Sequence, residues 1–265
     1  MRFLVTFALA NEFGPWREAA KFREEKDGAV EGVFRAEIQG ADVTVLLTGV
    51  GAQRAGRAVA RLLRGDERYE ALISSGLAGA LQTEMQVGQV IAARGITCEP
   101  VDPSARGGYL ETSRPLVEFA EACEATVVRR FYTAGHVVAS VEEKVRLAQT
   151  ADAVEMESFD VLLAGREEGI PGIAIRAISD RADEDLPLDM GEILNDDGRV
   201  SVARVLGQAA LRPQALPGLV RLGQQSKRAA ENLANFLGQY IGHIAGRMSA
   251  LEAHGAAARS SAAMQ

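Results

Sequence analysis

Short apolar runs rich in β-branched residues alternate along this chain with segments whose apolar residues recur every three or four positions. The short runs predict strands, over residues 3–8, 32–38, 42–48, 71–75, 89–93, 130–138, 153–156 and 172–178. The periodic segments predict helices, over residues 15–23, 52–63, 114–123, 141–149, 159–168 and 200–211, with a long helix within 216–246. Strands that alternate with helices favour a largely parallel sheet covered by helices. We therefore expect an α/β fold with three layers, α/β/α, around a central, mostly parallel, twisted mixed sheet.

The alternation of predicted strands and helices ends near residue 195. No repeat or linker interrupts residues 1–195, which we expect to form one domain. Residues 198–230 hold six basic and no acidic side chains. Beyond them, apolar residues recur at helical spacing, at Ala230, Leu233, Leu237, Tyr240 and Ile244. We expect residues 196–265 to form a helical, basic C-terminal extension with a frayed end.

Composition and charge narrow the class of protein. The chain has 265 residues, of which 47% are hydrophobic, so it is long and apolar enough to bury a sizeable core. Lys and Arg number 29 and Asp and Glu 36, for a formal net charge of −7. Such an acidic chain lacks the basic surface that nucleic-acid binding requires. With two cysteines, three histidines and no C-x-x-C motif, the sequence predicts no metal site.

The N-terminus carries a misleading feature. Residues 1–10 combine a charged start, a short apolar run and an A-L-A sequence, as a secretory signal does. A signal peptide needs about 15–30 residues, so we interpret this segment as a buried first strand. No run approaches the roughly 20 apolar residues that span a bilayer. Together with cysteines that fit reduced thiols, Cys98 and Cys123, these features predict a cytoplasmic protein.

Two glycine-rich sequences follow predicted strands: T-G-V-G at 48–51 and S-S-G-L-A-G-A at 74–80. Glycine lets a ligand approach bare backbone, and a helix that follows presents free N–H groups to an anion or hydroxyl. Each sequence by itself is more typical of an ordinary turn. They become candidate binding loops only in combination with charged residues nearby.

Two glutamates, Glu155 and Glu157, lie two residues apart at the end of a predicted strand. On a strand they would share one face, where burial is costly unless the carboxylates are paired or used. The alternative is that the strand ends at Val154 and both side chains are solvated. The apolar residues before and after the pair favour burial.

Asp180 ends another apolar strand, directly after Ser179. Partial burial at the edge of a sheet would favour the protonated form of this carboxyl group, as a general acid requires. Ser and Asp are also preferred helix caps. This segment alone leaves the acid and the cap as equal alternatives. A further carboxylate, Glu12, follows the first predicted strand.

Two motifs in this order and spacing, V-E-M-E-S at 154–158 and I-R-A-I-S-D-R-A-D at 175–183, resemble the purine nucleoside phosphorylase/nucleosidase superfamily. Its most similar branch is the 5′-methylthioadenosine/S-adenosylhomocysteine nucleosidases. Glu12 and the S-G-L-A-G-A sequence at 75–80 extend the resemblance over about residues 1–185. The resemblance implies a nucleoside phosphorylase-like fold and makes residues 1–195 a catalytic domain.

The resemblance also implies roles for individual residues. Asp180 resembles the general acid that protonates the departing purine, with Ser179 orienting it, and Glu12 resembles the base that activates water. Glu157 resembles the carboxylate that holds the ribose hydroxyls, with Met156 against the sugar. The full set of expected substrate-binding residues is Glu155, Met156, Glu157, Gly76, Ala78, Gly79 and Val138. The implied activity is hydrolysis of the N-glycosidic bond of a 5′-substituted, adenosine-type nucleoside, without a metal or other cofactor.

The chain departs from the family pattern at two places. Leu77 stands where the nucleosidases usually have a hydroxyl residue, and residues 137–141 replace the usual S-G-D stretch. The basic tail instead resembles that of hopanoid-associated phosphorylase-like members, which remove adenine from a lipid-linked adenosine. A membrane surface is therefore an alternative partner for residues 198–230, less favoured than packing on the acidic body.

Two further alternatives concern the reaction. Phosphorolysis, with phosphate as co-substrate, is one. The phosphorylases that this chain resembles place an arginine two residues before the glycine turn to hold phosphate. Residues 72–75 contain none, although Arg17 or Arg54 could substitute. A non-catalytic nucleoside-binding protein is disfavoured because Glu12, Glu157 and Asp180 occur together. The expected partners are a small nucleoside and, by resemblance, a second copy of the chain in a homodimer.

Overall fold

The computed structural model describes residues 1–26, 30–98, 108–187 and 213–262. Within these residues one twelve-stranded sheet forms the centre of the molecule. Its strands are β1 (Arg2–Phe7), β2 (Arg23–Glu24), β3 (Val33–Ile38), β4 (Ala41–Leu47), β5 (Ala71–Ala80), β6 (Val90–Ala93), β7 (Gly95–Cys98), β8 (Tyr109–Glu111), β9 (Thr126–Val128), β10 (Phe131–Thr133), β11 (Ala153–Glu155) and β12 (Gly172–Asp180). The helices are α1 (Ala10–Ala19), α2 (Ala52–Leu63), α3 (Arg114–Ala122), α4 (Val141–Leu147), α5 (Ser158–Glu167), a short 3-10 helix (Pro213–Ala215) and α8 (Leu216–Ala262).

The sheet is mixed, as predicted. Its main strand order is β2-β3-β4-β1-β5-β11-β10-β7-β8, and β12 pairs with both β5 and β6, which in turn pairs with β9. Strand β5 runs parallel to β1 and β12 and antiparallel to β11. Because three strands pair with β5, its carboxyl-terminal half lies at the junction of the two halves of the sheet.

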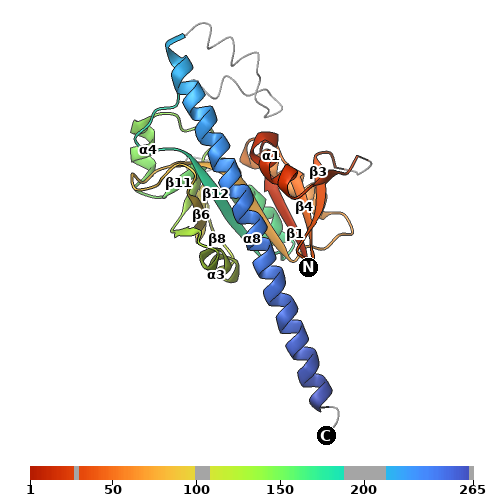
Figure 1. Ribbon diagram of the computed structural model, residues 1–265. Coiled ribbons are helices and arrows are strands. Elements are labelled where there is room, and N and C mark those ends of the chain that lie inside the picture. The colour runs from red at the N-terminus through yellow and green to blue at the C-terminus, as the bar shows by residue number, and fades with distance from the viewer. Residues whose placement is uncertain (27–29, 99–107, 188–212, 263–265) are drawn as a thin grey trace.

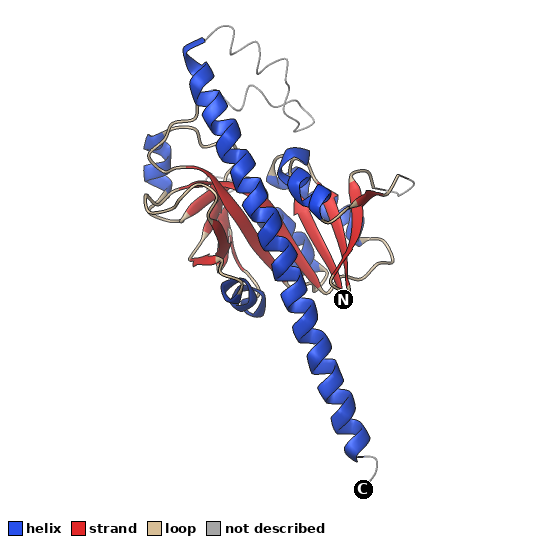
Figure 2. Ribbon diagram, in the orientation of Figure 1, coloured by secondary structure: helices blue, strands red, loops and turns tan. Residues whose placement is uncertain are grey.

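Alternating side chains divide the core into two layers, one on each face of the sheet. On one face Phe3 and Val5 of β1 pack with residues of α1, α3 and α8. On the other face Leu4 packs with residues of α2 and α5. The ribbon drawings show the same arrangement of helices on both sides of the sheet (Figures 1 and 2). The expected three-layer α/β/α architecture is therefore confirmed.

Helix α8 belongs to the same packed body as the sheet. Leu233, Leu237 and Tyr240 are fully buried and lie in the cluster that contains Phe3. Tyr240 donates a 2.8 Å hydrogen bond from its hydroxyl to the carbonyl of Leu116. The helix crosses one face of the sheet and projects beyond it at its C-terminal end (Figure 1). The apolar stripe predicted on this helix is therefore its sheet-facing side.

The basic extension is helical over its described part and is tied to the body by an ion pair. Arg221 lies 2.6 Å from Glu184, as expected for a tail that packs on an acidic surface. The helix predicted over 200–211 and the boundary at 195 lie outside the described residues, so the division into two regions remains a prediction. Helix α8 continues to Ala262. No helix in the described ranges combines the length and the apolar character needed to cross a bilayer.

Four segments differ from the sequence prediction. The glycine-rich stretch at 74–80 is not a turn before a helix but the second half of β5. Strand β12 continues through Asp180, whereas the strand predicted over 130–138 is confined to Phe131–Thr133. The helix predicted from residue 15 already begins at Ala10. In each extended case, pairing with a neighbouring strand or packing on the sheet overrides the local signal of glycine, serine or proline.

Candidate active site

The predicted site residues converge on one cavity of about 210 Å³ at the carboxyl-terminal ends of β5 and β12. Its wall combines carboxylates with aliphatic side chains and includes two residues of α8. Of the predicted residues it contains Glu12, Ala78, Gly79, Val138, Glu155, Met156, Glu157, Ser179 and Asp180. Gly76 is not among the lining residues. A site at the carboxyl ends of strands is typical of α/β folds.

Glu12 is presented by the first turn of α1, and its side chain reaches β5. One oxygen accepts a 3.1 Å hydrogen bond from the Leu9 backbone N–H, and the other accepts a 3.2 Å hydrogen bond from the Leu77 N–H. Glu12 is buried, and burial raises its pKa above the ordinary value, although the nearby Arg176 guanidinium opposes this shift. Glu12 can therefore hold or accept a proton at this place.

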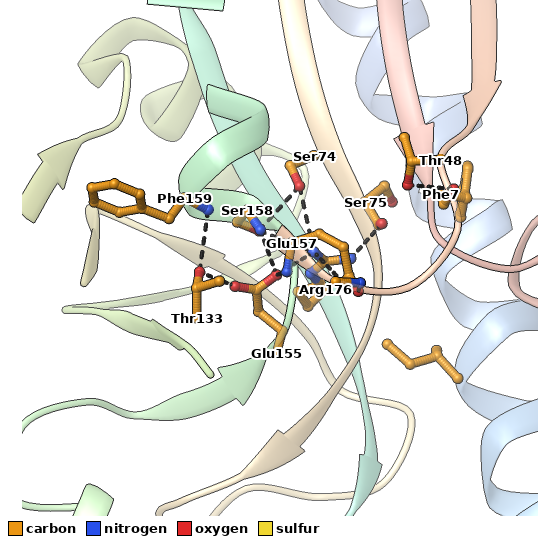
Figure 3. Close-up of polar contacts among 12 residues, drawn as sticks. Phe7, Thr48, Ser74, Ser75, Thr133, Glu155, Glu157, Ser158, Phe159 and Arg176 are labelled. Carbon is orange, nitrogen blue, oxygen red and sulfur yellow. Dashed lines mark hydrogen bonds and ion pairs between the residues drawn. The ribbon is translucent and has the colours of Figure 1, made fainter. Parts of the chain in front are cut away.

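Arg176 connects the carboxylates from behind the cavity. It lies in the middle of β12, its side chain is 1% exposed, and it forms an ion pair with Glu155. Its guanidinium also donates to the Ser75 carbonyl and, at 3.0 Å, to the Ser158 hydroxyl. Figure 3 shows these groups gathered around the guanidinium. This network fixes β11, β5 and β12 relative to one another.

Glu155 has no free oxygen within this network. One oxygen accepts from the Thr133 hydroxyl, and the other accepts from Arg176 and from the backbone N–H groups of Glu157 and Ser158, at 2.9 and 2.7 Å. The carboxylate thus holds the turn from β11 into α5 (Figure 3). This geometry favours positioning of Glu157 over direct contact with a ligand, although Glu155 was expected to bind substrate.

Glu157 is buried as well, which excludes the alternative of two solvated glutamates. One of its oxygens accepts a 3.0 Å hydrogen bond from the Gly51 N–H, and the other lies 3.5 Å from Arg176. Gly51 precedes α2 and has φ +105°, a conformation that favours glycine. The backbone N–H that the T-G-V-G sequence offers at Gly51 thus binds the chain's own Glu157. Burial raises the pKa of Glu157 to about 7, against the lowering effect of Arg176.

This shift predicts a pH dependence of stability. Since the pKa of Glu157 is about 7 in the folded chain against an ordinary 4.5, the unfolded chain ionises first as pH rises. The contribution of Glu157 is fully present below pH 4.5 and is lost as pH rises through about 7. Urea unfolding at pH 5 and pH 8 should show wild-type protein losing stability relative to Glu157→Gln. A difference between the two proteins that stays constant or moves the other way would contradict the shift.

Asp180 and Ser179 lie at an irregularity in the pairing of β12 with β5. The register shifts between Ile178 and Asp180, as in a β-bulge, a feature that re-aims side chains beside active sites. The Ser179 hydroxyl donates to Asp180 Oδ1 at 2.7 Å, as expected for a residue that orients it. Asp180 lies in a strand, and no helix begins in the described residues 181–187. The helix-cap alternative is therefore wrong.

A lysine that the sequence analysis did not single out completes this part of the site. Lys144 Nζ lies 2.6 Å from Asp180 Oδ2, and the lysine side chain is fully buried. Asp180 is buried, as the sequence suggested, but its carboxyl group also faces an ammonium group.

The small residues of β5 make room for these side chains. A Cβ on Gly76, which has φ +141°, would overlap the Arg176 guanidinium and lie 3.2 Å from Glu12 Oε2. A Cβ on Gly79 would lie 3.0 Å from Asp180 Oδ2. Leu77, between them, is among the residues that line the cavity. The glycines thus serve the site by admitting charged side chains rather than by forming a turn.

The distance between the Glu12 and Asp180 carboxyl groups follows from where each contacts β5. The Glu12 carboxylate lies at Gly76–Leu77 and the Asp180 carboxylate at Gly79. Two to three residues of strand correspond to about 7–10 Å. A spacing of roughly 6.5–9.5 Å between two carboxyl groups leaves room for a water molecule on one side of a scissile glycosidic bond.

Apart from its carboxylates, the cavity is mostly apolar. Leu9, Val50, Val138, Leu186 and Leu222 contribute to its wall. Among the lining residues, all of them described, none is a lysine or arginine. No group of three His, Cys, Asp or Glu side chains in the described part of the chain is arranged to hold a metal ion.

Sequence signals for the two missed residues differ in strength. Arg176 interrupts an apolar strand, and a buried charge of this kind requires a partner. The glutamates at 155 and 157 are the acidic residues that could partner Arg176. Lys144 occupies the inner face of α4, three residues after Val141 and four before Ala148, but a lysine in a charged helix more often faces solvent.

Comparison with known proteins places this geometry in a family. The model of the phosphorylase superfamily matches residues 2–209. A 5′-methylthioadenosine/S-adenosylhomocysteine nucleosidase of Marinomonas sp. (strain MWYL1) is 29% identical over 181 residues, which are 61% of this chain and 78% of that protein. An aminodeoxyfutalosine nucleosidase of Campylobacter jejuni is 22% identical over 225 residues, which are 78% of this chain and 97% of that protein.

A solved structure shows the same fold. The 5′-methylthioadenosine/S-adenosylhomocysteine nucleosidase of Helicobacter pylori, crystallised with butyl-thio-DADMe-Immucillin-A, superposes with a TM-score of 0.70 and 19% identity, covering 91% of this chain and 97% of that chain. The expectation that the chain is an enzyme is confirmed by these matches. The family model covers more than half of the sequence, and the chain therefore belongs to the phosphorylase superfamily.

Proposed function

We propose that this enzyme hydrolyses the N-glycosidic bond of a purine nucleoside, of adenosine type and substituted at the 5′ position, and releases the free base. The observation that carries the proposal is the convergence of Glu12, Glu157 and Asp180 on one cavity, with Glu12 and Asp180 about 7–10 Å apart along β5. The names of the two curated relatives support the same class of reaction.

The residue types suit the charges that develop when a glycosidic bond breaks. The sugar becomes oxocarbenium-like and positive, so nearby carboxylates stabilise it. Glu157 holds the ribose hydroxyls, with Met156 against the sugar. Glu12, whose pKa is raised by burial, accepts a proton from the attacking water.

The departing purine becomes negative and must receive a proton as the bond breaks. Asp180, held by Ser179 at the other end of the cavity, delivers that proton to the purine ring. Proton transfer of this kind typically contributes about 10²–10⁴-fold. The apolar remainder of the wall, including Leu9 and Leu222, favours burial of an apolar 5′ substituent.

Water is the nucleophile that the lining favours. The cavity wall carries carboxylates and, among its residues, neither lysine nor arginine, so a phosphate dianion would meet negative charge. Arg17 lies over the Phe34 ring, 4.6 Å from its centroid. Arg54 lines an adjoining cavity, which shares Ala8 and Leu9 with the first, so phosphorolysis is the alternative that an experiment must address.

The test is release of adenine from 5′-methylthioadenosine, measured with and without phosphate. We expect release in phosphate-free buffer and free 5-methylthioribose as the sugar product. Release that depends strictly on phosphate, with a sugar phosphate as product, would overturn hydrolysis in favour of phosphorolysis. Binding without release from any purine nucleoside would favour a nucleoside-binding protein.

The position of Glu157 predicts discrimination by the sugar. A buried carboxylate that loses its hydroxyl partner costs about 1–3 kcal/mol, so kcat/KM for a 2′-deoxynucleoside should fall about 5- to 150-fold below that for the ribonucleoside. The Glu157→Gln variant should lose most of this discrimination. Equal efficiency of wild-type enzyme on both sugars would contradict the assignment of Glu157.

A further inference from the structure

Lys144 is a fully buried charged side chain beside the cavity. Its ammonium group donates three hydrogen bonds, to Asp180 Oδ2 at 2.6 Å, to the Arg181 carbonyl at 2.7 Å and to the Glu184 carbonyl at 2.9 Å. Three acceptors match the three protons of an ammonium group. The side chain is fully buried and does not line the cavity. Lys144 therefore meets a ligand only through Asp180.

The hydrogen bonds to Asp180 define its charge state before the reaction. Oδ1 accepts from the Ser179 hydroxyl and Oδ2 from Lys144. A carboxylate that faces an ammonium group at this distance forms a charge-assisted hydrogen bond as an anion. An anion has no proton to give to the departing base. The proton of the proposed reaction must then come from the other member of the pair.

We infer that Lys144 is a positioning residue that supplies this proton, and the compensating positive charge, through Asp180. The inference rests on the proposed function. A buried ion pair is seldom retained for its stability, since desolvation offsets much of the attraction. A lysine, unlike an arginine, can give up its proton inside a protein.

The step conserves charge and protons. The glycosidic electron pair leaves with the purine; an N–H bond of Lys144 breaks as an O–H bond forms on Asp180, and a proton passes from Asp180 to the purine nitrogen. The ammonium becomes an amine, Asp180 returns to a carboxylate, and the base leaves neutral. The water that attacks the sugar gives its proton to Glu12. Proton exchange with solvent then restores Glu12 and Lys144.

The physical advantage lies in the charges that this transfer avoids. Without it, a purine anion would form beside the Asp180 carboxylate in a cavity that holds two further glutamates facing the ligand, Glu12 and Glu157. Like charges at such distances repel strongly where water is excluded. Proton transfer from Lys144 removes the positive charge of the ammonium group and the negative charge of the departing purine together. Asp180 is then the one charged member of the Lys144–Asp180 pair.

The experiment compares two leaving groups. Lys144→Met and Lys144→Gln are assayed on 5′-methylthioadenosine, whose base needs a proton, and on 4-nitrophenyl β-D-ribofuranoside, whose leaving group departs as a stable anion. We expect kcat on the nucleoside to fall about 10²-fold or more with little change in KM, and kcat on the aryl riboside to fall only a few-fold. The ratio of the two rates does not depend on how much of a preparation is folded.

Lys227→Met is the matched control, because Lys227 is a 76% exposed lysine on α8; its ratio should equal that of wild type. A loss shared equally by both substrates in the Lys144 variants, as from a purely structural role, would overturn the inference. So would nucleoside turnover close to that of wild type. Wild-type enzyme that cleaves no nucleoside would instead show that the proposed function itself has failed.

Discussion

The Asp180→Asn variant is expected to lose about 10²–10⁴-fold in kcat on a purine nucleoside, with a much smaller change in KM. Asparagine keeps nearly the same shape, and its one carbonyl oxygen can still accept from Lys144 while its amide NH2 donates to the Ser179 hydroxyl, but it cannot carry a proton to the leaving base. Steady-state release of adenine measures kcat and KM. Calorimetric titration with a nucleoside measures whether binding survives.

A matched control is available three residues away. Asp183 pairs with Arg181 at 2.8 Å on the exposed side of the same segment, so Asp183→Asn makes the same chemical change outside the cavity. Its kcat should stay near that of wild type. Because Asp180→Asn leaves the Lys144 ammonium without its counter-charge, rates are compared per folded molecule. Turnover within a few-fold of wild type would remove Asp180 from the mechanism.

Local patterns predicted much of the fold because its elements carry strong periodic signals. The helix expected over 52–63 has those bounds as α2, and the apolar runs that begin at residues 3, 42 and 172 became β1, β4 and β12 within one residue of their predicted starts. These segments either pack one clear face or are buried on both faces. Their local and tertiary preferences therefore agree.

The glycine-rich stretch at 74–80 is a strand that local residue preferences do not predict. Gly and Ser favour turns when nothing else is known, yet this stretch pairs with β12 from Ser74 to Gly79 and with β11 at Gly79 and Ala80. The small residues are there because Arg176 and Asp180, about a hundred residues later in the chain, occupy the space above them. A constraint imposed by distant side chains leaves no periodic signal in the strand itself.

The candidate site was predictable in its residue types but not in its pairing. Motifs identified the carboxylates that the structure brings to one cavity, whereas the partner of each carboxylate depends on contacts between distant segments. Asp180 meets Lys144 from α4, 36 residues earlier, and Glu157 meets Gly51, 106 residues earlier. At Glu157 these partners oppose burial, since Arg176 and the Gly51 N–H lower the pKa that burial raises.

Arg176→Met is expected to lower the free energy of unfolding by about 3–5 kcal/mol, the usual effect of removing one partner from a buried ion pair. Glu155 and Glu157 would be left in the core without their counter-charge, because both carboxylates face the same guanidinium. Urea unfolding followed by circular dichroism measures the loss. Arg114→Met is the control: Arg114 is 85% exposed and pairs with Glu118 on α3, a contact worth about 0.3–0.5 kcal/mol.

A double variant separates the charge from the packing of the Arg176 side chain. Adding Glu155→Gln to Arg176→Met removes one uncompensated charge and keeps a side chain that can still accept from the Ser158 N–H. If charge imbalance dominates the loss, the double variant should recover part of the stability that Arg176→Met loses.

Arg176→Lys should also be less stable than wild type, because an ammonium group cannot reach both glutamates and the Ser75 carbonyl as the planar guanidinium does. A free energy of unfolding for Arg176→Met within about 1 kcal/mol of wild type would mean that the Arg176–Glu155 ion pair is not what holds β11 to β12. So small a loss is far below the cost of an unpaired buried charge.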